Sequence, residues 1–583
     1  MSPMFFSLVL FGFVGTQLHL AGKVSSQDTP PTAIDTRNNI TYHGVHVNQV
    51  EKFFNIPYGR AERFGNPEPY NFPSNKTLYD ASVRGPVCPQ PPGSASIGWE
   101  QSEDCLRLKV ARPEGVKMGD KLPVMVFIYG GSMFAGSIND PRHEPDSLVL
   151  QSVENGLPVV YIAMNYRLNI FGFAISDSLR ANNSLNVGLK DQRLALEWVQ
   201  QNIEYFGGDP ERMTILGQSS GGLSVANQIL AYGGSRPVPF HAAIMQSTAL
   251  EPGSTSNVTV DSFNDVVRLA GCDFGDSGSP QSSKSLDCLR ALPFQTLLNY
   301  AISQRDSTAD QNFGDIYLPT VDGDFVPLSS SQLTNKGLFP KIPLMIGWTD
   351  QDLTILTPPT LNSSSETRTF IGTMFPGLTN DTVSTILELY PSSDFPPNKE
   401  AGLSSEFYRS AQIFRDGLLV CPSFLFGHAM ARKYDNGDEV PSVYYYDQNQ
   451  IPPGYLGQSA AMGVFHGADA PYVFGNFSAF DGLGELHPRP EDYELQRKQS
   501  RSWSGFGNVG RPSLEGHDTL EGWAPAYESG SGMFDAGVYL VGGSSPGLSK
   551  LDGEGAKDHL KKERLRERCA FLNQDEVIAQ LKY

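Results

Sequence analysis

Six short apolar segments, separated by longer amphipathic stretches, place the strongest constraint on how this chain can fold. Their length and their content of β-branched and aromatic residues are typical of buried strands. Strands that alternate with helices indicate the α/β class, with a mostly parallel central sheet covered by helices on both faces. The segments are PVMVFIYGG (123–131), LPVVYIAMNYR (157–167), RMTILGQ (212–218), AAIMQS (242–247), IPLMIGW (342–348) and SVYYYD (442–447).

The stretch KDQRLALEWVQQNIEYFGG lies between two of these segments and has the periodicity of a helix. The apolar residues recur at helical spacing, in the two sets Leu194 and Trp198, and Ala195, Val199 and Ile203. Gly207 and Gly208 follow as a stop signal. The sequence therefore predicts a helix that connects two parallel strands.

No linker divides the 583 residues into separate domains, although a chain of this length has room for several. We therefore predict one domain with long insertions over residues 27–583, preceded by a signal peptide over residues 1–26. The Gly- and Ser-rich stretch 528–557 is expected to be a loop of low regularity.

Several features indicate secretion. The apolar run in MSPMFFSLVLFGFVGTQLHLAG is too short to span a bilayer and is followed by small and polar residues, as in a signal peptide. An N-terminal membrane anchor is the alternative interpretation. Six cysteines without a Cys-Xaa-Xaa-Cys pair suit disulfides better than zinc. We expect no transmembrane anchor in the mature chain, and glycosylation at the sequons Asn39, Asn75, Asn182, Asn257, Asn362, Asn380 and Asn476.

The formal net charge of -19 argues against a nucleic-acid partner, because phosphate binding needs concentrated Lys and Arg. The one basic cluster, KKERLRER (561–568), is interleaved with acidic residues and is expected to be the solvated face of a terminal helix. The sequence contains no metal motif such as His-Glu-Xaa-Xaa-His and no phosphate-binding loop. We therefore expect neither a metal nor another cofactor.

Two Gly-Xaa-Ser-Xaa-Gly matches raise the question of a nucleophilic serine. Ser219, in GQSSG, follows the apolar stretch MTIL and precedes a plausible helix, GLSVANQILAYG. A sharp strand-to-helix turn of this kind exposes a serine hydroxyl beside a base. Ser545, in GSSPG, has neither neighbour, and Pro546 after it has no backbone N–H to offer to an oxyanion. Ser219 is therefore the candidate nucleophile, and an ordinary strand-to-helix turn is the alternative.

The longer stretch FGGDPERMTILGQSSGG resembles the extended serine signature of the type-B carboxylesterase/lipase family, the cholinesterase-like branch of the α/β-hydrolases. The resemblance continues over nearly the whole mature chain, in FFNIPYGRAERFGNPEP, SEDCLRLKV, NYRLNIFGF, FGNVGRP and GWAPAY. It is the resemblance of a secreted fungal-type member. It implies the α/β-hydrolase fold, with a large and mostly parallel central sheet.

The resemblance also implies a catalytic triad. Ser219 matches the nucleophile, and His466 in MGVFHGADAPYVFGN matches the general base. Asp352 in GWTDQDL stands where the family usually has Glu, so the loop or the imidazole must shift by about one carbon–carbon bond to keep the contact. Asp350, slightly earlier in the same segment, is the competing candidate for the acid.

The oxyanion hole implied by the resemblance consists of the backbone N–H groups of Gly131, Ser132 and Ser220. Ser132 stands where the family has a third glycine, so its side chain restricts φ although its N–H remains. Of the three donors, Ser132 is the one that departs from the family's pattern. The resemblance further implies three disulfides, which are Cys88–Cys105, Cys272–Cys288 and Cys421–Cys569.

Two positions argue against a quaternary ammonium substrate. Trp99 lies out of register with the cation-binding Trp of cholinesterases, and Gln218 stands where those enzymes have Glu beside the nucleophile. The resemblance thus implies a carboxylesterase or lipase that cleaves neutral small-molecule or lipid esters through an acyl-serine. A catalytically inactive binding or adhesion module and an acyltransferase that uses the same acyl-serine are the alternatives. The presence of all three triad residues argues against the inactive module.

Overall fold

The computed structural model describes residues 29–93, 95–249, 257–274, 279–308, 315–432, 442–453, 459–481 and 487–583. The expected signal peptide, residues 1–26, lies outside the described residues.

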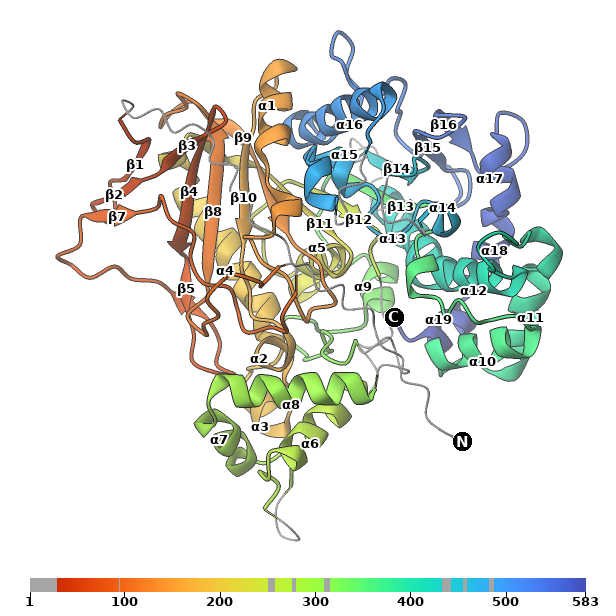
Figure 1. Ribbon diagram of the computed structural model, residues 1–583, viewed down its shortest axis with the longest axis horizontal. Helices are drawn as coiled ribbons and strands as arrows, with labels where there is room; N and C mark the ends of the chain where they lie inside the picture. The colour runs from red at the N-terminus through yellow and green to blue at the C-terminus, as the bar shows by residue number, and fades with distance from the viewer. Residues whose placement is uncertain are drawn as a thin grey trace.

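An eleven-stranded mixed sheet forms the centre of the molecule (Figure 1). Its strand order is β16-β15-β14-β13-β12-β11-β9-β10-β8-β4-β3. The strands from β9 to β15 run parallel, whereas β8, β4 and β3 at one edge and β16 at the other pair antiparallel. The flanking strands are β3 (Val45–Val47), β4 (Val50–Pro57), β8 (Arg107–Pro113), β15 (Gly537–Val541) and β16 (Gly547–Lys550).

The six predicted strands are all present, and they form the parallel centre of the sheet. Every residue of β10, β12, β13 and β14 is buried, as expected for strands covered on both faces. The six strands are β9 (Leu122–Ile128), β10 (Val160–Met164), β11 (Gly208–Gln218), β12 (Ala242–Gln246), β13 (Leu344–Thr349) and β14 (Val443–Gln448).

Two groups of helices cover the sheet (Figure 1). Helices α1 (Asp146–Glu154), α15 (Ala470–Phe474) and α16 (Pro490–Val509) pack together on one face. The predicted connecting helix is α4 (Val187–Asn202), which packs with α5 (Ser220–Leu230) and α13 (Cys421–Arg432) against the other face. The mostly parallel sheet and its two helical layers confirm the predicted fold class.

The insertions contribute the remaining elements. The helices are α2 (Asn169–Phe173), α3 (Asp177–Ala181), α6 (Val258–Leu269), α7 (Ser283–Ala291), α8 (Phe294–Ser307), α9 (Ser330–Asn335), α10 (Ser364–Met374), α11 (Asn380–Leu389), α12 (Ser405–Arg415), α14 (Ser459–Met462), α17 (Asp558–Glu563), α18 (Leu565–Leu572) and α19 (Asp575–Leu581). Two small sheets comprise β1 (Thr32–Asp35), β2 (Ile40–His43) and β7 (Leu78–Asp80), and β5 (Gly59–Arg60) and β6 (Glu68–Pro69).

The prediction that 528–557 is an irregular loop was wrong in its central part. The segment contains β15, which pairs in parallel with β14, and β16, which closes that edge of the sheet. The apolar run GVYLV supplies the buried residues of β15. The strand was not predicted because its flanks are rich in glycine and its partner strand, β14, lies far away in the sequence.

The prediction that KKERLRER is a solvated face was also wrong in part. Lys561, Lys562 and Glu567 are exposed, but Glu563 is 7% exposed and Arg568 is 1% exposed. These two buried charges belong to an ion network with distant residues. Among the helices of the described residues, none has the length and apolarity needed to cross a membrane.

Candidate active site

Ser219 lies at the sharp turn between β11 and α5. Its backbone has φ 62° and ψ -130°, a conformation that is strained for a residue with a side chain. The turn packs so closely on its neighbours that a Cβ at Gly221 would lie 2.1 Å from the Ile128 carbonyl oxygen. The Ser219 N–H donates to the Gln246 carbonyl of β12 at 2.9 Å. The glycines of the motif thus allow the turn, and the neighbouring strand fixes it.

His466 and Asp352 meet beyond the ends of the parallel strands. The distance between His466 Nδ1 and Asp352 Oδ1 is 2.5 Å, and the Asp352 side chain is fully buried. Asp352 Oδ2 accepts hydrogen bonds from the Ser247 hydroxyl at 2.7 Å and the Thr349 N–H at 2.8 Å. The His466 N–H donates to the Asp352 carbonyl at 2.9 Å. The ring and the carboxylate are therefore fixed by both main-chain and side-chain contacts.

This carboxylate changes the proton affinity of the imidazole. Burial alone lowers the pKa of His466, but the charge of Asp352 and its hydrogen bond outweigh burial and raise that pKa above its ordinary value. Asp469 and Asp315 add smaller contributions in the same direction. The arrangement therefore favours a ring that accepts a proton readily.

Gln218 contacts the nitrogen of the His466 ring that does not face Asp352. Its Nε2 lies 3.2 Å from His466 Nε2, and the Ser219 hydroxyl makes no hydrogen bond to any described residue. An amide N–H that donates to Nε2 requires that nitrogen to be unprotonated, which places the imidazole proton on Nδ1 toward Asp352. A base that removes a proton from Ser219 needs this same tautomer. The lack of a hydrogen bond between Ser219 and His466 is compatible with this role, because catalytic hydrogen bonds are often long before substrate binds.

The three residues of the expected oxyanion hole lie on two segments that are tied together. Gly131 has φ 117° and Ser132 has φ 59°, so this loop has the left-handed conformation that the missing third glycine would favour. Ser220 is the first residue of α5, and its hydroxyl accepts the Met133 N–H at 3.1 Å. This bond joins the loop after β9 to the nucleophile turn.

Asp350, the competing acid, points to a different environment. Its Oδ1 lies 3.3 Å from His559 Nε2 and 4.0 Å from Arg415 Nη1. Burial raises the pKa of Asp350 despite these cationic neighbours. The structure thus brings Asp352, and not Asp350, into contact with His466.

Two acidic residues near His466, Asp469 and Asp315, were not predicted from the sequence. Asp469 is fully buried and accepts hydrogen bonds from Gln246 Nε2 at 2.6 Å and the Tyr446 hydroxyl at 2.8 Å. Burial raises the pKa of Asp315 to about 7, whereas the Ser132 side chain, Arg305 and His466 lower it. Asp469 follows His466 closely in the sequence, but no motif marks Asp315.

The structure joins the cysteines in three pairs, which are the pairs implied by the resemblance: Cys88–Cys105, Cys272–Cys288 and Cys421–Cys569. The last pair connects α13 with α18 and so attaches the C-terminal helices to the body of the domain.

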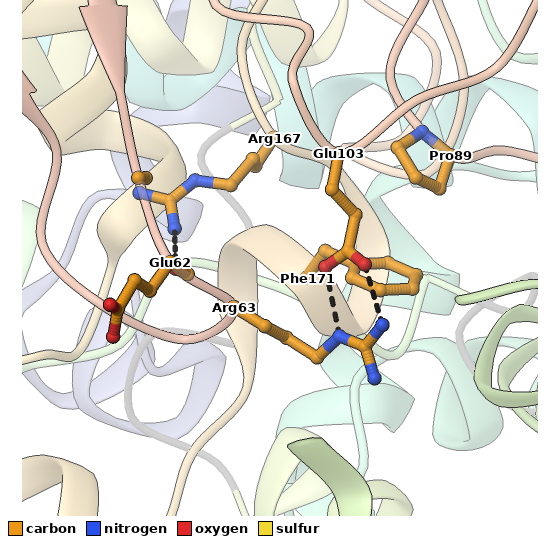
Figure 2. A pocket seen from close by; sticks show the side chains of 7 residues that line it. Glu62, Arg63, Pro89, Glu103, Arg167 and Phe171 are labelled. Atoms are coloured by element: carbon orange, nitrogen blue, oxygen red, sulfur yellow. Dashed lines mark hydrogen bonds and ion pairs between the residues drawn. The ribbon is translucent and has the colours of Figure 1, made fainter. Parts of the chain in front are cut away.

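A separate small pocket is lined by Glu62, Arg63, Pro89, Glu103, Arg167, Phe171 and Ala61 (Figure 2). Its two arginines are already paired. Arg63 forms two hydrogen bonds with the Glu103 carboxylate, at 2.8 and 2.5 Å, and Arg167 Nη1 donates to the Glu62 carbonyl at 3.2 Å. Arg167 also forms an ion pair with Asp191 at 2.6 Å. Both guanidinium groups of the pocket are therefore engaged by carboxylates of the protein itself.

Comparison with known proteins identifies the family. A profile of the carboxylesterase family matches residues 37–537. The chain belongs to the carboxylesterase family. Membership of this carboxylesterase family supports carboxylic ester hydrolase activity.

Individual relatives agree with this assignment. The carboxylesterase chain is 43% identical to a secreted lipase of Arthroderma benhamiae over 561 residues, which cover 95% of this chain and 96% of the relative. It is 34% identical to an inactive carboxylesterase-like protein of Byssochlamys spectabilis, with 90% and 92% covered. The crystal structure of Aspergillus niger EstA has the same fold, with a TM-score of 0.74 at 24% identity and coverage of 95% and 99%.

Proposed function

We propose that this carboxylesterase-family chain is a secreted serine hydrolase that cleaves neutral carboxylic esters through an acyl-serine intermediate. The observation that carries the proposal is the 2.5 Å contact of His466 Nδ1 with the buried Asp352 carboxylate, close to the strained turn of Ser219. A nucleophile, a base and an orienting acid are the parts that acyl transfer requires.

The mechanism follows from these parts. His466 Nε2 takes the Ser219 proton as the hydroxyl oxygen attacks the ester carbonyl, and Asp352 stabilises the resulting imidazolium. The N–H groups of Gly131, Ser132 and Ser220 stabilise the oxyanion, and each such donor contributes on the order of 10²- to 10³-fold in rate. The intermediate then expels the alcohol, which takes the proton from His466. Water, activated by the same ring, cleaves the acyl-serine and releases the acid.

The surroundings of the site favour an uncharged substrate. Gln218 offers an amide where a carboxylate would attract a cation. The Arg84 guanidinium lies 5.7 Å from the centre of the Trp99 ring, so a cation of the protein already occupies the vicinity of that ring. The similarity to a secreted lipase supports acyl esters as the substrate class.

The proposal is tested by trapping and by kinetics. A fluorophosphonate probe is expected to label Ser219, as located by peptide mass spectrometry, and p-nitrophenyl esters are expected to give a rapid burst of one p-nitrophenol per chain when deacylation is slow. A chain without label and without turnover would instead be an inactive relative like the Byssochlamys protein. Products formed with and without added alcohol separate hydrolysis from acyl transfer.

Secretion is part of this proposal, and the sequon positions support it. Six of the seven sequon asparagines are exposed, whereas Asn476 is half-buried. Asn476 Nδ2 also donates to the Pro141 carbonyl at 2.8 Å, so its amide is less accessible for glycan attachment. Expression in a eukaryotic host should yield an extracellular protein whose mass falls on endoglycosidase treatment. Retention of the chain inside the cell would contradict secretion.

Asp315→Asn provides a test through the pH dependence. The Asp315 carboxylate raises the pKa of His466, so its removal is expected to lower that pKa. Because the base acts in its neutral form, kcat/KM should then persist to lower pH than in the wild type. Asp324→Asn, which changes a carboxylate paired with Arg236 away from the site, is the matched control. An acidic limb that stays unchanged or moves to higher pH would show that Asp315 does not influence His466.

A further inference from the structure

Four ionisable side chains from three parts of the chain converge at the carboxyl ends of β13 and β14. Asp350 follows β13, Asp447 lies on β14, and His559 and Glu563 lie on α17. One potential ligand atom from each of the four lies within 4.8 Å of the others. This cluster is separate from His466 and Asp352.

The imidazole stands between two carboxylates. His559 Nε2 lies 3.3 Å from Asp350 Oδ1 and 3.2 Å from Asp447 Oδ2. Ligands of a tetrahedral zinc ion lie about 2.0–2.2 Å from the metal, which places neighbouring ligand atoms about 3.3–3.6 Å apart. These two separations are therefore close to the edges of a metal coordination tetrahedron.

Two buried oxygens of the cluster lack a partner. Asp447 is fully buried and Glu563 is 7% exposed. Among the described residues, Asp447 Oδ1 and Glu563 Oε2 have no hydrogen-bond partner, although Glu563 Oε1 accepts from Arg415 Nη1 at 2.7 Å. A buried carboxylate oxygen without a partner is costly, which indicates that another group satisfies it.

The charges around the cluster do not balance. The carboxylates of Asp350, Asp447 and Glu563 are accompanied by that of Asp416, which is 2.9 Å from Arg415 Nη2. Within the described residues, the guanidinium groups of Arg415 and Arg568 act on this group of acids. Four ionised carboxylates facing two guanidinium groups leave one negative charge uncompensated when the imidazole is protonated, and two when it is neutral, as a metal ligand must be. A dication matches this excess.

We propose that Asp350, Asp447, His559 and Glu563 bind one divalent transition-metal ion, such as Zn²⁺. One imidazole with three carboxylates suits Zn²⁺ or Mn²⁺, whereas Ca²⁺ prefers oxygen ligands alone. The ion fastens the C-terminal helix α17 to the ends of β13 and β14. It also fixes the segment that leads from Asp350 to Asp352, so its role is structural.

A proton is the competing occupant of the cluster. Burial lowers the pKa of His559, but the hydrogen bond to Asp447 and the charges of Glu563 and Asp350 outweigh burial and raise that pKa to about 10. A protonated ring would bridge the two carboxylates without a metal. Metal binding requires the Nε2 proton to leave, so the two occupants exclude each other.

The test uses the full-length mature protein without a histidine tag, stripped of metal by chelation. Titration with Zn²⁺, followed by metal analysis after gel filtration, is expected to give one ion per chain in the wild type. Zn²⁺ should also raise the Tm of the wild type, because it binds the folded state. Ca²⁺ at the same concentration should do neither.

Variants locate the site. His559→Gln and Asp447→Asn are expected to weaken Zn²⁺ binding by at least about tenfold and to remove the Tm increase. His46→Gln is the matched control, because its ring lies 3.9 Å from Glu114 in a histidine–carboxylate pair outside the cluster. Circular dichroism checks that each variant is folded. If His559→Gln does not fold, Asp447→Asn tests the site in its place. Absence of Zn²⁺ binding by the stripped wild type, or equal binding by both cluster variants, would overturn the proposal in favour of the proton. Binding is measured without substrate and is therefore independent of the proposed hydrolysis.

Discussion

Replacing Ser219 with alanine is expected to reduce kcat for a short p-nitrophenyl ester by on the order of 10⁵- to 10⁶-fold. The variant lacks the oxygen that forms the acyl bond, and no neighbouring hydroxyl can substitute for it. Ser220 is adjacent, but its hydroxyl accepts the Met133 N–H and points to the loop after β9. Residual activity above the water rate would come from the oxyanion hole and from binding alone.

The structure offers a matched control for this experiment. Ser545 shares the Gly-Xaa-Ser-Xaa-Gly spelling, but it lies between β15 and β16 at the edge of the sheet, where Lys557 Nζ donates to its carbonyl. Ser545→Ala should therefore retain wild-type activity. Equal activity of the two variants would refute the assignment of Ser219. Serine and alanine have similar backbone preferences at φ 62°, so Ser219→Ala should also fold.

The parallel centre of the sheet could be predicted because its strands are buried on both faces. The sequences of such strands are continuous apolar runs. The strands after Ile342 and before Ser219 can therefore be recognised without knowing which strands they pair with. β15 was missed for the opposite reason. Its five residues stand between glycine-rich stretches, and only pairing with β14 makes them a strand.

The buried charges of the C-terminal region could not be predicted from the local sequence pattern. In KKERLRER the spacing of charges is that of a solvated helix, and nothing nearby reveals that Glu563 meets Arg415, which is 148 residues away in the sequence. Burial of a charge depends on its partner, and the partner is set by the tertiary fold. The same limit applies to Asp315, whose relation to Ser132 and His466 arises only when the loops assemble.

The residues of the site differ in how much the sequence says about them. Ser219 and its glycines form a local motif, because the turn itself requires residues without side chains. The choice between Asp350 and Asp352 is not local, since both belong to one short loop. It depends on which side chain faces β12 and which faces α17, and that is decided by contacts with Ser247 and His559.

Asp352→Asn is expected to lower kcat by on the order of 10⁴-fold while leaving the fold intact. The reason lies in the hydrogen bonds around Oδ2, which accepts both the Ser247 hydroxyl and the Thr349 N–H. The Thr349 N–H is a fixed backbone donor, so the asparagine must turn its carbonyl oxygen to that side. Its NH₂ group then faces His466 Nδ1. The imidazole proton is driven to Nε2, and the ring can no longer accept the proton of Ser219.

Asp350→Asn is the matched variant, with the same chemical change in the same loop. The Asp350 side chain faces His559 and Arg415, so its loss should alter stability and metal binding but change kcat by less than about tenfold. The pH dependence separates the two variants further. Asp352→Asn removes the main group that raises the pKa of His466, whereas Asp350 is not among the groups with the largest effect on that pKa. A larger loss of kcat in Asp350→Asn than in Asp352→Asn would reverse the assignment of the acid, because it would mean that the loop rearranges when substrate binds.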